Sequence, residues 1–196
     1  MYYILPLLYV FTLLVFLWSI LHPQRITAEQ IAQAYLGSIT IPFLLSGVMR
    51  ILLQHENGRV YVLLPFLAAW CSDSLALVFG MLFGKHKLIP QVSPKKTVEG
   101  AVGGVIGAVA GLCIFGYFAG NKLGVEPNYL LLSAAGVVGS LAGMLGDLAL
   151  SLIKRKTGIK DYGHIMPGHG GVLDRFDSVI FTAPLFEILL HFTSAI

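Results

Sequence analysis

Residues 129–153 read YLLLSAAGVVGSLAGMLGDLALSLI and contain a single charged side chain, that of Asp147. Because roughly 20 apolar residues in a helix cross the ~30 Å hydrocarbon core of a bilayer, this stretch is long enough to span a membrane. The whole chain has the same character, since hydrophobic residues make up 56% of its 196 residues and charged residues 12%. Soluble domains carry about twice that share of charge. The composition therefore indicates an integral membrane protein and excludes a water-soluble globule, a disordered chain and a secreted disulfide scaffold.

Apolar stretches of similar length recur along the chain. They predict an all-α fold, a polytopic transmembrane helix bundle with about six spans. The other five predicted spans are Tyr2–Leu21, Ile31–Leu53, Val60–Phe83, Ala101–Gly120 and Phe176–Ile196. The last is the weakest, because it contains Asp177, Pro184, Glu187 and His191. Gly103, Gly107 and Gly111 form a GxxxGxxxG stripe, which predicts close packing between helices.

Basic residues are distributed unevenly between the two sides of this predicted bundle. Ten of the 13 Lys and Arg residues follow the first, third or fifth span, and the other three lie on the opposite side. By the positive-inside rule, the basic loops 84–100 and 154–175 are expected to face the cytoplasm. The formal net charge of +3 is too small to indicate a nucleic-acid partner.

Two acidic residues, Asp73 and Asp147, fall inside predicted spans. An ionised carboxylate within a bilayer is costly, so such residues usually face the interior of a bundle or a water-filled cavity. Asp147 continues a ladder of small residues at every fourth position, Ala135, Gly139 and Gly143, which places it on a helix–helix face. Two interpretations stay open: acids paired with lysines to hold the bundle together, or acids of a functional site.

The two basic loops contain residue types that bind phosphate and a divalent cation. Residues 84–100, GKHKLIPQVSPKKTVEG, offer lysines and backbone N–H groups for phosphate oxygens, although a solvated basic loop explains them equally well. Residues 151–177, SLIKRKTGIKDYGHIMPGHGGVLDRFD, combine a basic cluster with glycines and with Asp174 and Asp177. Their spacing of three puts both carboxylates on one side if a helix begins here. Carboxylates beside lysines and glycines suit a magnesium-bound polyphosphate.

These residues resemble a known family. Three separated blocks, in the right order, are similar to the motif regions of phosphatidate cytidylyltransferase, also called CDP-diacylglycerol synthase. The first two blocks are Trp70–Gly100 and Gly146–Leu148. The third comprises Ser151, Lys154, Arg155, Lys160, Asp161, Pro167, His169, Gly170, Gly171, Asp174, Arg175 and Asp177. Leu77, Val78 and Val98 depart from the aromatic residues usual in the family, but no departure removes a charge.

The resemblance implies transfer of the cytidylyl group of CTP to phosphatidate, which forms CDP-diacylglycerol and pyrophosphate for phospholipid biosynthesis. It implies Mg²⁺ as the cofactor, and a second cation beside it is left open. The catalytic residues it implies are Asp147, Asp174, Lys154, Arg155 and Arg175, and the metal ligands are Asp147, Asp174, Asp73 and Asp177. The substrate-binding residues it implies are Ser93, Lys95, Lys96, Thr97, His169, Gly170 and Gly171.

The domain organisation and location follow from the same resemblance. Residues 1–60 are expected to form N-terminal hydrophobic spans, and residues 61–196 the catalytic CTP-transferase membrane domain. The expected location is a bacterial-type plasma (inner) membrane, with the active site facing the cytoplasm. The expected partners are CTP, phosphatidate and membrane lipid, with no nucleic acid, and a homodimer is left open.

Two alternatives are retained. A CDP-archaeol synthase-like enzyme would act on an ether lipid phosphate, but the usual LDQLDF ending of those enzymes differs from the LDRFD of residues 173–177, which favours the diacyl substrate. A cation transporter using Asp73 and Asp147 belongs to a different class. It explains the buried acids but leaves the two loops with phosphate-binding character unexplained.

Overall fold

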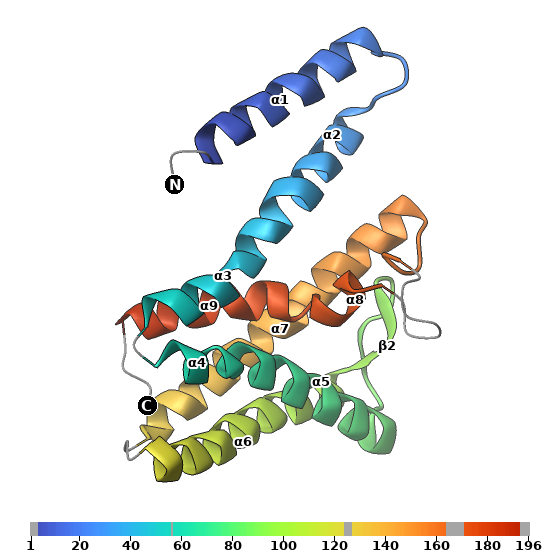
Figure 1. The fold of residues 1–196 in the computed structure, drawn as a ribbon. Helices are drawn as coiled ribbons and strands as arrows, with labels where there is room; N and C mark the ends of the chain where they lie inside the picture. Colours follow the sequence, from blue (N-terminus) through green and yellow to red (C-terminus); the bar gives the residue numbers. More distant parts are fainter. Residues whose placement is uncertain (1–3, 56, 124–126, 164–170, 193–196) are drawn as a thin grey trace. The chain divides into compact units, whose positions relative to one another are not determined.

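The computed structural model describes residues 4–55, 57–123, 127–163 and 171–192 (Figure 1). The chain divides into two compact units, Met1–Phe43 and Leu44–Ile196. The boundary between these units falls within helix α3 (Ile41–Gln54), and the division into functional regions at residues 60/61 stays a prediction. In the second unit, α3 packs so closely on helix α9 that a Cβ atom on Gly47 would lie 3.0 Å from the backbone nitrogen of Pro184.

The first unit is helical in its described residues. The apolar helix α1 (Ile4–Leu21) is followed by α2 (Ala28–Tyr35), which continues through a π-helical segment (Leu36–Thr40) into α3. A capping box begins α2. The Thr27 hydroxyl accepts a hydrogen bond from the Gln30 N–H at 3.3 Å, and the Gln30 side chain accepts one from the Thr27 N–H at 3.0 Å. This pairing satisfies two N–H groups that a helix start leaves without intrahelical partners.

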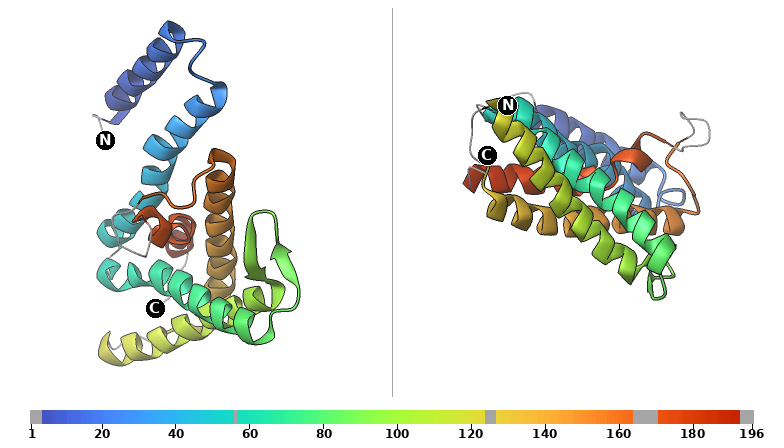
Figure 2. Two further views of the ribbon diagram at one scale, coloured as in Figure 1. Left: turned by 90° about the vertical axis from the view of Figure 1, so that its right-hand side faces the viewer. Right: turned by 90° about the horizontal axis from the view of Figure 1, so that it is seen from below.

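The second unit is a helix bundle with one β-hairpin. Its elements, in chain order after α3, are α4 (Gly58–Tyr61), α5 (Leu63–Phe83), β1 (Lys87–Ile89), β2 (Ser93–Thr97), α6 (Val98–Leu123), α7 (Tyr129–Thr157), α8 (Leu173–Phe176) and α9 (Val179–Phe192). Helices α5 and α6 lie side by side, and α7 packs against α6 and α9 (Figures 1 and 2). The hairpin joins the end of α5 to the start of α6 and stands beside α7 (Figure 2, left).

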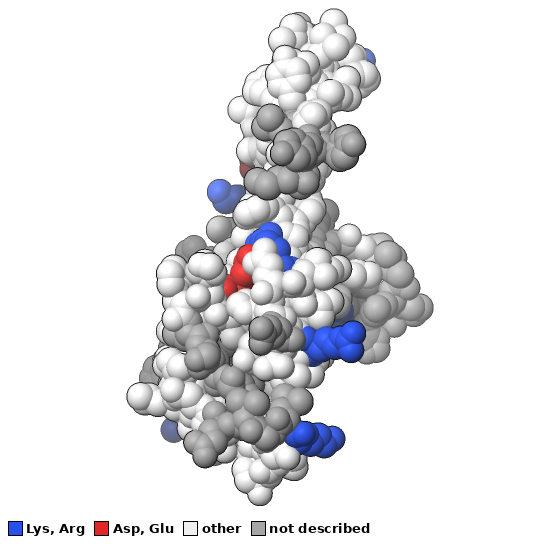
Figure 3. Space-filling model, turned by 60° about the vertical axis from the view of Figure 1, so that its left-hand side comes forward, with Lys and Arg blue, Asp and Glu red and all other residues white. Residues whose placement is uncertain are grey.

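Within the described residues, four helical segments are long and apolar enough to cross a membrane: Ala28–Gln54, Gly58–Phe83, Val98–Lys122 and Tyr129–Thr157. They coincide with the second to fifth predicted spans, and they confirm an all-α integral membrane protein. Helices α1 and α9 are apolar but shorter, so the number of six spans stays a prediction. Among the described residues in the view of Figure 3, basic and acidic side chains occupy only small areas, as a face in contact with lipid requires.

The predicted glycine stripe lies at the contact between α6 and α5. A Cβ atom on Gly107 would lie 2.5 Å from the carbonyl oxygen of Cys71, and one on Gly111 would lie 2.6 Å from the Cys71 sulfur. Real Cβ atoms do not approach other atoms so closely, and only glycine permits this separation of the two helices. The structure thus confirms close packing as the role of the stripe.

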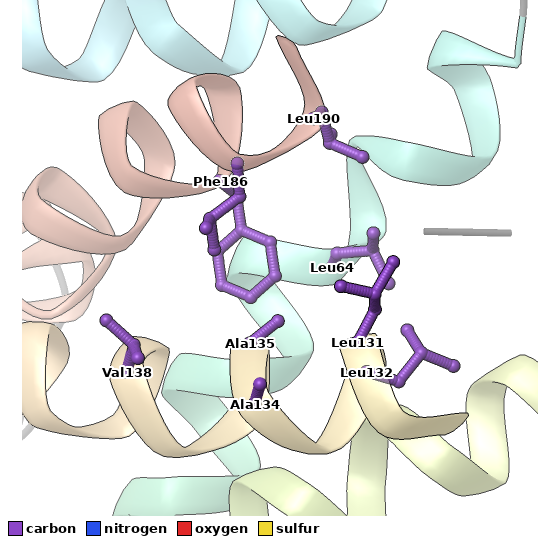
Figure 4. Close-up of a pocket in the computed structure, with 9 residues that line it drawn as sticks. Leu64, Leu131, Leu132, Ala134, Ala135, Val138, Phe186 and Leu190 are labelled. Atoms are coloured by element: carbon purple, nitrogen blue, oxygen red, sulfur yellow. The ribbon is translucent and has the colours of Figure 1, made fainter. Parts of the chain in front are cut away.

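The core of the second unit lies where α5, α7 and α9 meet. Phe186 is 1% exposed and extends from α9 towards α7, with Ala135 below its ring and Leu64 of α5 beside it (Figure 4). These side chains border an apolar cavity of about 90 Å³, lined by Leu64, Leu131, Leu132, Ala134, Ala135, Val138, Phe186, Leu189 and Leu190. Ala135 and Asp147 are twelve residues apart in α7, so this cavity lies about 18 Å along the helix from the acid.

Residues 84–100, expected to be a loop, contain an antiparallel hairpin in which Lys87 pairs with Thr97 and Ile89 with Ser93. The base of the hairpin is held by Glu99 in the first turn of α6. Its carboxylate accepts hydrogen bonds from the backbone N–H of Lys85 at 3.1 Å and that of His86 at 3.2 Å, and contacts the His86 ring at 2.6 Å. The hairpin is therefore tied to the start of α6.

Candidate active site

A pocket of about 620 Å³ lies where the end of α5, the hairpin, the start of α6 and the second half of α7 meet. Five residues predicted for the site line it: Asp73, Lys95, Lys96, Thr97 and Asp147. Its other lining residues are Ala76, Leu77, Gly80, Met81, Lys87, Leu88, Gly100, Ala101 and Met144. The pocket thus brings together two acids from the spans, three lysines from the hairpin and several apolar side chains.

Asp147 is paired with a lysine from the hairpin. The Lys96 ammonium forms an ion pair with its carboxylate, and the two side chains are 25% and 23% exposed. The other carboxylate oxygen accepts a hydrogen bond from the Ser151 hydroxyl at 3.2 Å. The prediction that Asp147 faces the bundle and not lipid agrees with this arrangement. Lys96 lines the same pocket, so this ion pair fits both interpretations of Asp147, an acid that holds the bundle together and an acid of a functional site.

Asp73 enters the pocket from α5, close to the start of α9. Its carboxylate accepts a hydrogen bond from the Ser178 hydroxyl at 3.1 Å. It also interacts electrostatically with Asp147, which repels it, and with Lys96, which attracts it. The two acids found in separate predicted spans therefore belong to one electrostatic site.

A second cluster surrounds Asp174, whose side chain is 10% exposed. Its carboxylate accepts three hydrogen bonds, from the Lys154 ammonium at 2.9 Å, the Tyr162 N–H at 2.8 Å and the Gly171 N–H at 2.9 Å. Burial opposes ionisation of this carboxyl, but the three hydrogen bonds outweigh burial and lower the pKa of Asp174 below its ordinary value. Asp174 is held as an anion.

Asp177 lies between the two clusters. The spacing was expected to put Asp174 and Asp177 on one side if a helix began here. Helix α8 ends at Phe176 and α9 begins at Val179, so the two residues do not belong to one continuous helix. The Asp177 carboxylate accepts a hydrogen bond from the Ser178 N–H at 2.8 Å. It interacts electrostatically with Asp147 and Asp73 of the pocket and with Lys154 of the second cluster.

The remaining predicted residues lie around these two clusters. Arg155 is exposed, and its Nε donates to the carbonyl oxygen of Val92 in the hairpin turn at 3.5 Å. Ser93 is a residue of β2, and Arg175 is exposed on α8. Among the described residues, these three and the Asp174 cluster are not part of the pocket lining. His169 and Gly170 lie outside the described residues.

The carboxylates fit a divalent cation by their chemistry. Hard cations such as Mg²⁺ take carboxylate oxygens as ligands. Among the described residues, two lysines, Lys96 and Lys154, form ion pairs with these four carboxyl groups, and a divalent cation would neutralise further negative charge here. In the described part of the chain, no three His, Cys, Asp or Glu side chains are arranged to hold one ion, and Asp147 and Asp174 are each paired with a lysine.

Comparison with known proteins identifies the family. A sequence model described as the Cytidylyltransferase family matches residues 2–193, which is nearly the whole chain. The chain belongs to the cytidylyltransferase family. This membership confirms the resemblance drawn from the three sequence blocks.

Curated relatives within the cytidylyltransferase family are closely similar over part of their length. The phosphatidate cytidylyltransferase of Staphylococcus haemolyticus is 44% identical over 144 residues, which are 74% of this chain and 54% of that protein. That of Staphylococcus saprophyticus is 43% identical over 152 residues, 78% of this chain and 57% of the relative. That of Staphylococcus aureus is 43% identical over 144 residues, with coverages of 74% and 54%. The chain thus spans about half the length of the curated relatives it matches.

Sequence reasoning missed three contributors to the candidate site. Lys87 lines the pocket, but it was counted only as part of the basic loop. Tyr162 donates its backbone N–H to Asp174, and its hydroxyl donates to the carbonyl oxygen of Leu150 at 3.0 Å. Ser178 contacts Asp73 and Asp177. The only available signal was its position directly after Asp177.

Proposed function

We propose that the chain transfers the cytidylyl group of CTP to phosphatidate, forming CDP-diacylglycerol and pyrophosphate in phospholipid biosynthesis. The observation that carries this proposal is the pocket lined by Asp73 and Asp147 together with three hairpin lysines. A cation transporter does not require three lysines beside its acids, whereas the binding of a negatively charged nucleoside triphosphate requires cationic side chains. The relatives are named phosphatidate cytidylyltransferases, which supports the diacyl substrate over an ether lipid.

The reaction is a displacement at the α-phosphorus of CTP. An oxygen of the lipid phosphate forms a bond to that phosphorus, the bond to the β-phosphate oxygen breaks, and pyrophosphate leaves with the electron pair. A phosphate monoester is already an anion near neutral pH, so the attack needs no general base. Catalysis then consists of positioning the two substrates and neutralising their charge.

The chain's residues divide this work between cations and acids. Lys95 and Lys96, with Lys87 beside them, hold the triphosphate in the pocket, while Lys154, Arg155 and Arg175 hold the phosphates at its rim. Thr97 is 6% exposed and accepts the Gly100 N–H at the start of α6, which fixes the hairpin against the helix. Mg²⁺, held by Asp147, Asp174, Asp73 and Asp177, would supply neutralisation of the triphosphate charge, with a second cation beside it left open.

The location of the pocket would give access both to water-soluble CTP and to a lipid phosphate in the membrane. The pocket lies at the end of the spans that carries the hairpin and the basic end of α7. By the positive-inside rule, that end is proposed to face the cytoplasm, where CTP is available, and the membrane is proposed to be a bacterial plasma membrane. The apolar pocket residues Leu77, Met81 and Met144 would face the lipid. A homodimer would be recognised by a doubled protein mass in nanodiscs.

The test is pyrophosphate release by the purified chain in nanodiscs, with CTP, Mg²⁺ and either phosphatidate or an archaeal ether-lipid phosphate. Release is expected with phosphatidate. Asp147→Asn is expected to lower kcat by at least about 10²-fold, as for loss of a group that stabilises transition-state charge. Glu187→Gln is a matched control, because Glu187 forms an ion pair with Arg50 at 2.5 Å in the same bundle. Glu187 and Arg50 are 20% and 26% exposed, and Asp147 and Lys96 are 23% and 25% exposed.

Each outcome has a definite meaning. Near-normal turnover of Asp147→Asn would remove the pocket from the reaction. Equal losses in Asp147→Asn and Glu187→Gln would show that only bundle stability was measured. If the wild type releases no pyrophosphate and instead conducts cations in proteoliposomes in a manner that depends on Asp147, the transporter alternative is correct.

A further inference from the structure

Ser178 connects two of the acids in the candidate active site. It is 2% exposed and lies between the short helix α8 and the start of α9. Its hydroxyl donates to Asp73 at 3.1 Å, and its backbone N–H donates to Asp177 at 2.8 Å. One buried residue therefore holds a carboxylate from α5 and a carboxylate from the α8–α9 junction, which are 104 positions apart in the chain.

The position of Ser178 is fixed from several sides. Its carbonyl oxygen accepts the N–H groups of Phe181 at 3.3 Å and Thr182 at 3.1 Å, so Ser178 forms part of the first turn of α9. Close packing of this turn on α7 requires Gly146, where a Cβ atom would lie 2.7 Å from the carbonyl oxygen of Asp177. The hydroxyl is thus delivered to Asp73 by a turn that has little freedom to move.

The acids need such a partner because they repel one another. Asp73, Asp147 and Asp177 interact as like charges, and Lys96 pairs directly with Asp147. A hydrogen bond to an ionised carboxylate is stronger than one between neutral groups and fixes the direction of the carboxylate oxygens. Residues that hydrogen-bond to a metal ligand orient that ligand, and their loss typically weakens metal binding about 10- to 100-fold.

We propose that Ser178 is a positioning residue, which orients Asp73 by its hydroxyl and Asp177 by its N–H for binding of a divalent cation. This inference rests on the proposed function of the site. It assigns to Ser178 a role that differs from packing, and the same helix offers a comparison. Thr182, one turn further on, is 0% exposed, and its hydroxyl donates to the carbonyl oxygen of Pro65 at 3.2 Å.

The test measures Mn²⁺ binding without nucleotide, by electron paramagnetic resonance on the full chain in nanodiscs. Ser178→Ala removes the hydroxyl and is expected to weaken Mn²⁺ binding by about tenfold or more. Ser178→Cys keeps the size of the side chain but offers only a weak S–H donor, so a similar loss is expected. Thr182→Val removes a buried hydroxyl without touching an acid, and its Mn²⁺ affinity is expected to stay within about twofold of the wild type. Thermal midpoints are recorded for all three variants.

The outcomes separate this inference from the proposed function. Unchanged Mn²⁺ affinity in Ser178→Ala or Ser178→Cys overturns the inference, as does equal weakening in Thr182→Val or an absence of Mn²⁺ binding by the wild type. If Ser178→Ala does not fold, Ser178→Cys decides. If the two Ser178 variants weaken Mn²⁺ binding as expected but the wild type shows no turnover with CTP and phosphatidate, the positioning role stands and the proposed function fails.

Discussion

Two glycines of α7 allow a sharp test of how the start of α9 is positioned. Gly143 and Gly146 both face α9, but the space beside them differs. A Cβ atom on Gly146 would lie 2.7 Å from the carbonyl oxygen of Asp177 and 2.8 Å from the Phe181 ring. A Cβ atom on Gly143 would have its nearest neighbours at 3.4 Å (Thr182) and 3.5 Å (Ser178), which are ordinary contacts. Only Gly146→Ala therefore forces atoms to move.

The size of the effect follows from these distances. To restore a contact of 3.4 Å, the Asp177 carbonyl would have to move by about 0.7 Å, and overpacking of this kind typically costs about 1–3 kcal/mol. Replacing glycine by alanine inside a helix also stabilises the helix by up to ~1 kcal/mol. Because both positions lie in the interior of α7, this gain is common to both variants and cancels in their comparison. Gly146→Ala should therefore be about 1–3 kcal/mol less stable than Gly143→Ala.

The assay is thermal unfolding of both variants in nanodiscs, together with pyrophosphate release. For a chain of this size, 1 kcal/mol corresponds to a shift in Tm of about 2–4 °C, so the two midpoints should differ by at least ~2 °C. Gly146→Ala should also lose turnover, because the displaced backbone carries Asp177, while Gly143→Ala should keep it. Equal midpoints, or a more stable Gly146→Ala, would refute the reasoning from close approach.

Two further predictions concern the Asp174 cluster. Tyr162→Phe removes the hydrogen bond to the Leu150 carbonyl but keeps the ring, over which the Lys154 ammonium lies 5.4 Å from the centroid. We expect a loss of about 0.5–1.5 kcal/mol in unfolding free energy with kcat unchanged, and a fall in kcat would contradict this. The folded-state pKa of Asp174 is lowered, so its contribution to stability is present above the unfolded-state pKa of about 3.9 and is lost as the pH falls through the folded pKa. The midpoint advantage of the wild type over Asp174→Asn should therefore shrink between about pH 4 and that lower pKa, and an advantage independent of pH would exclude the ionised form.

The positions of the acids were predictable from general physical rules. An acid in an apolar span must face a bundle or a cavity, and Asp73 and Asp147 do line one pocket. The even number of predicted spans between the two basic loops required both to lie on one side. The contact between Arg155 and Val92 of the hairpin shows that they do meet. These inferences need only chain connectivity and the cost of burying charge.

The hairpin and the choice of ion-pair partners could not be predicted in the same way. Pro90 and Pro94 interrupt residues 84–100 and remove any alternating pattern. The observed hairpin is tied at its base by Glu99, which accepts hydrogen bonds from backbone groups 13 and 14 positions earlier. Four lysines lie in that segment, and nothing in their spacing shows that Lys96 reaches Asp147. These contacts depend on how distant segments pack.

The same long-range contacts make the site depend on the fold. Asp73 takes its donor from the start of α9, Asp147 from the hairpin, and Asp174 from α7 and from the segment that follows it. Burying a carboxylate without a partner costs several kcal/mol, so the partly buried Asp147 and Asp174 depend on their distant lysine partners. A substitution that shifts α9, such as Gly146→Ala, should disturb the contact between Ser178 and Asp73 as well as the packing. Stability and activity should consequently fall together at such packing positions, whereas a residue that acts only by orienting a carboxylate should lower metal affinity without a matching loss of stability.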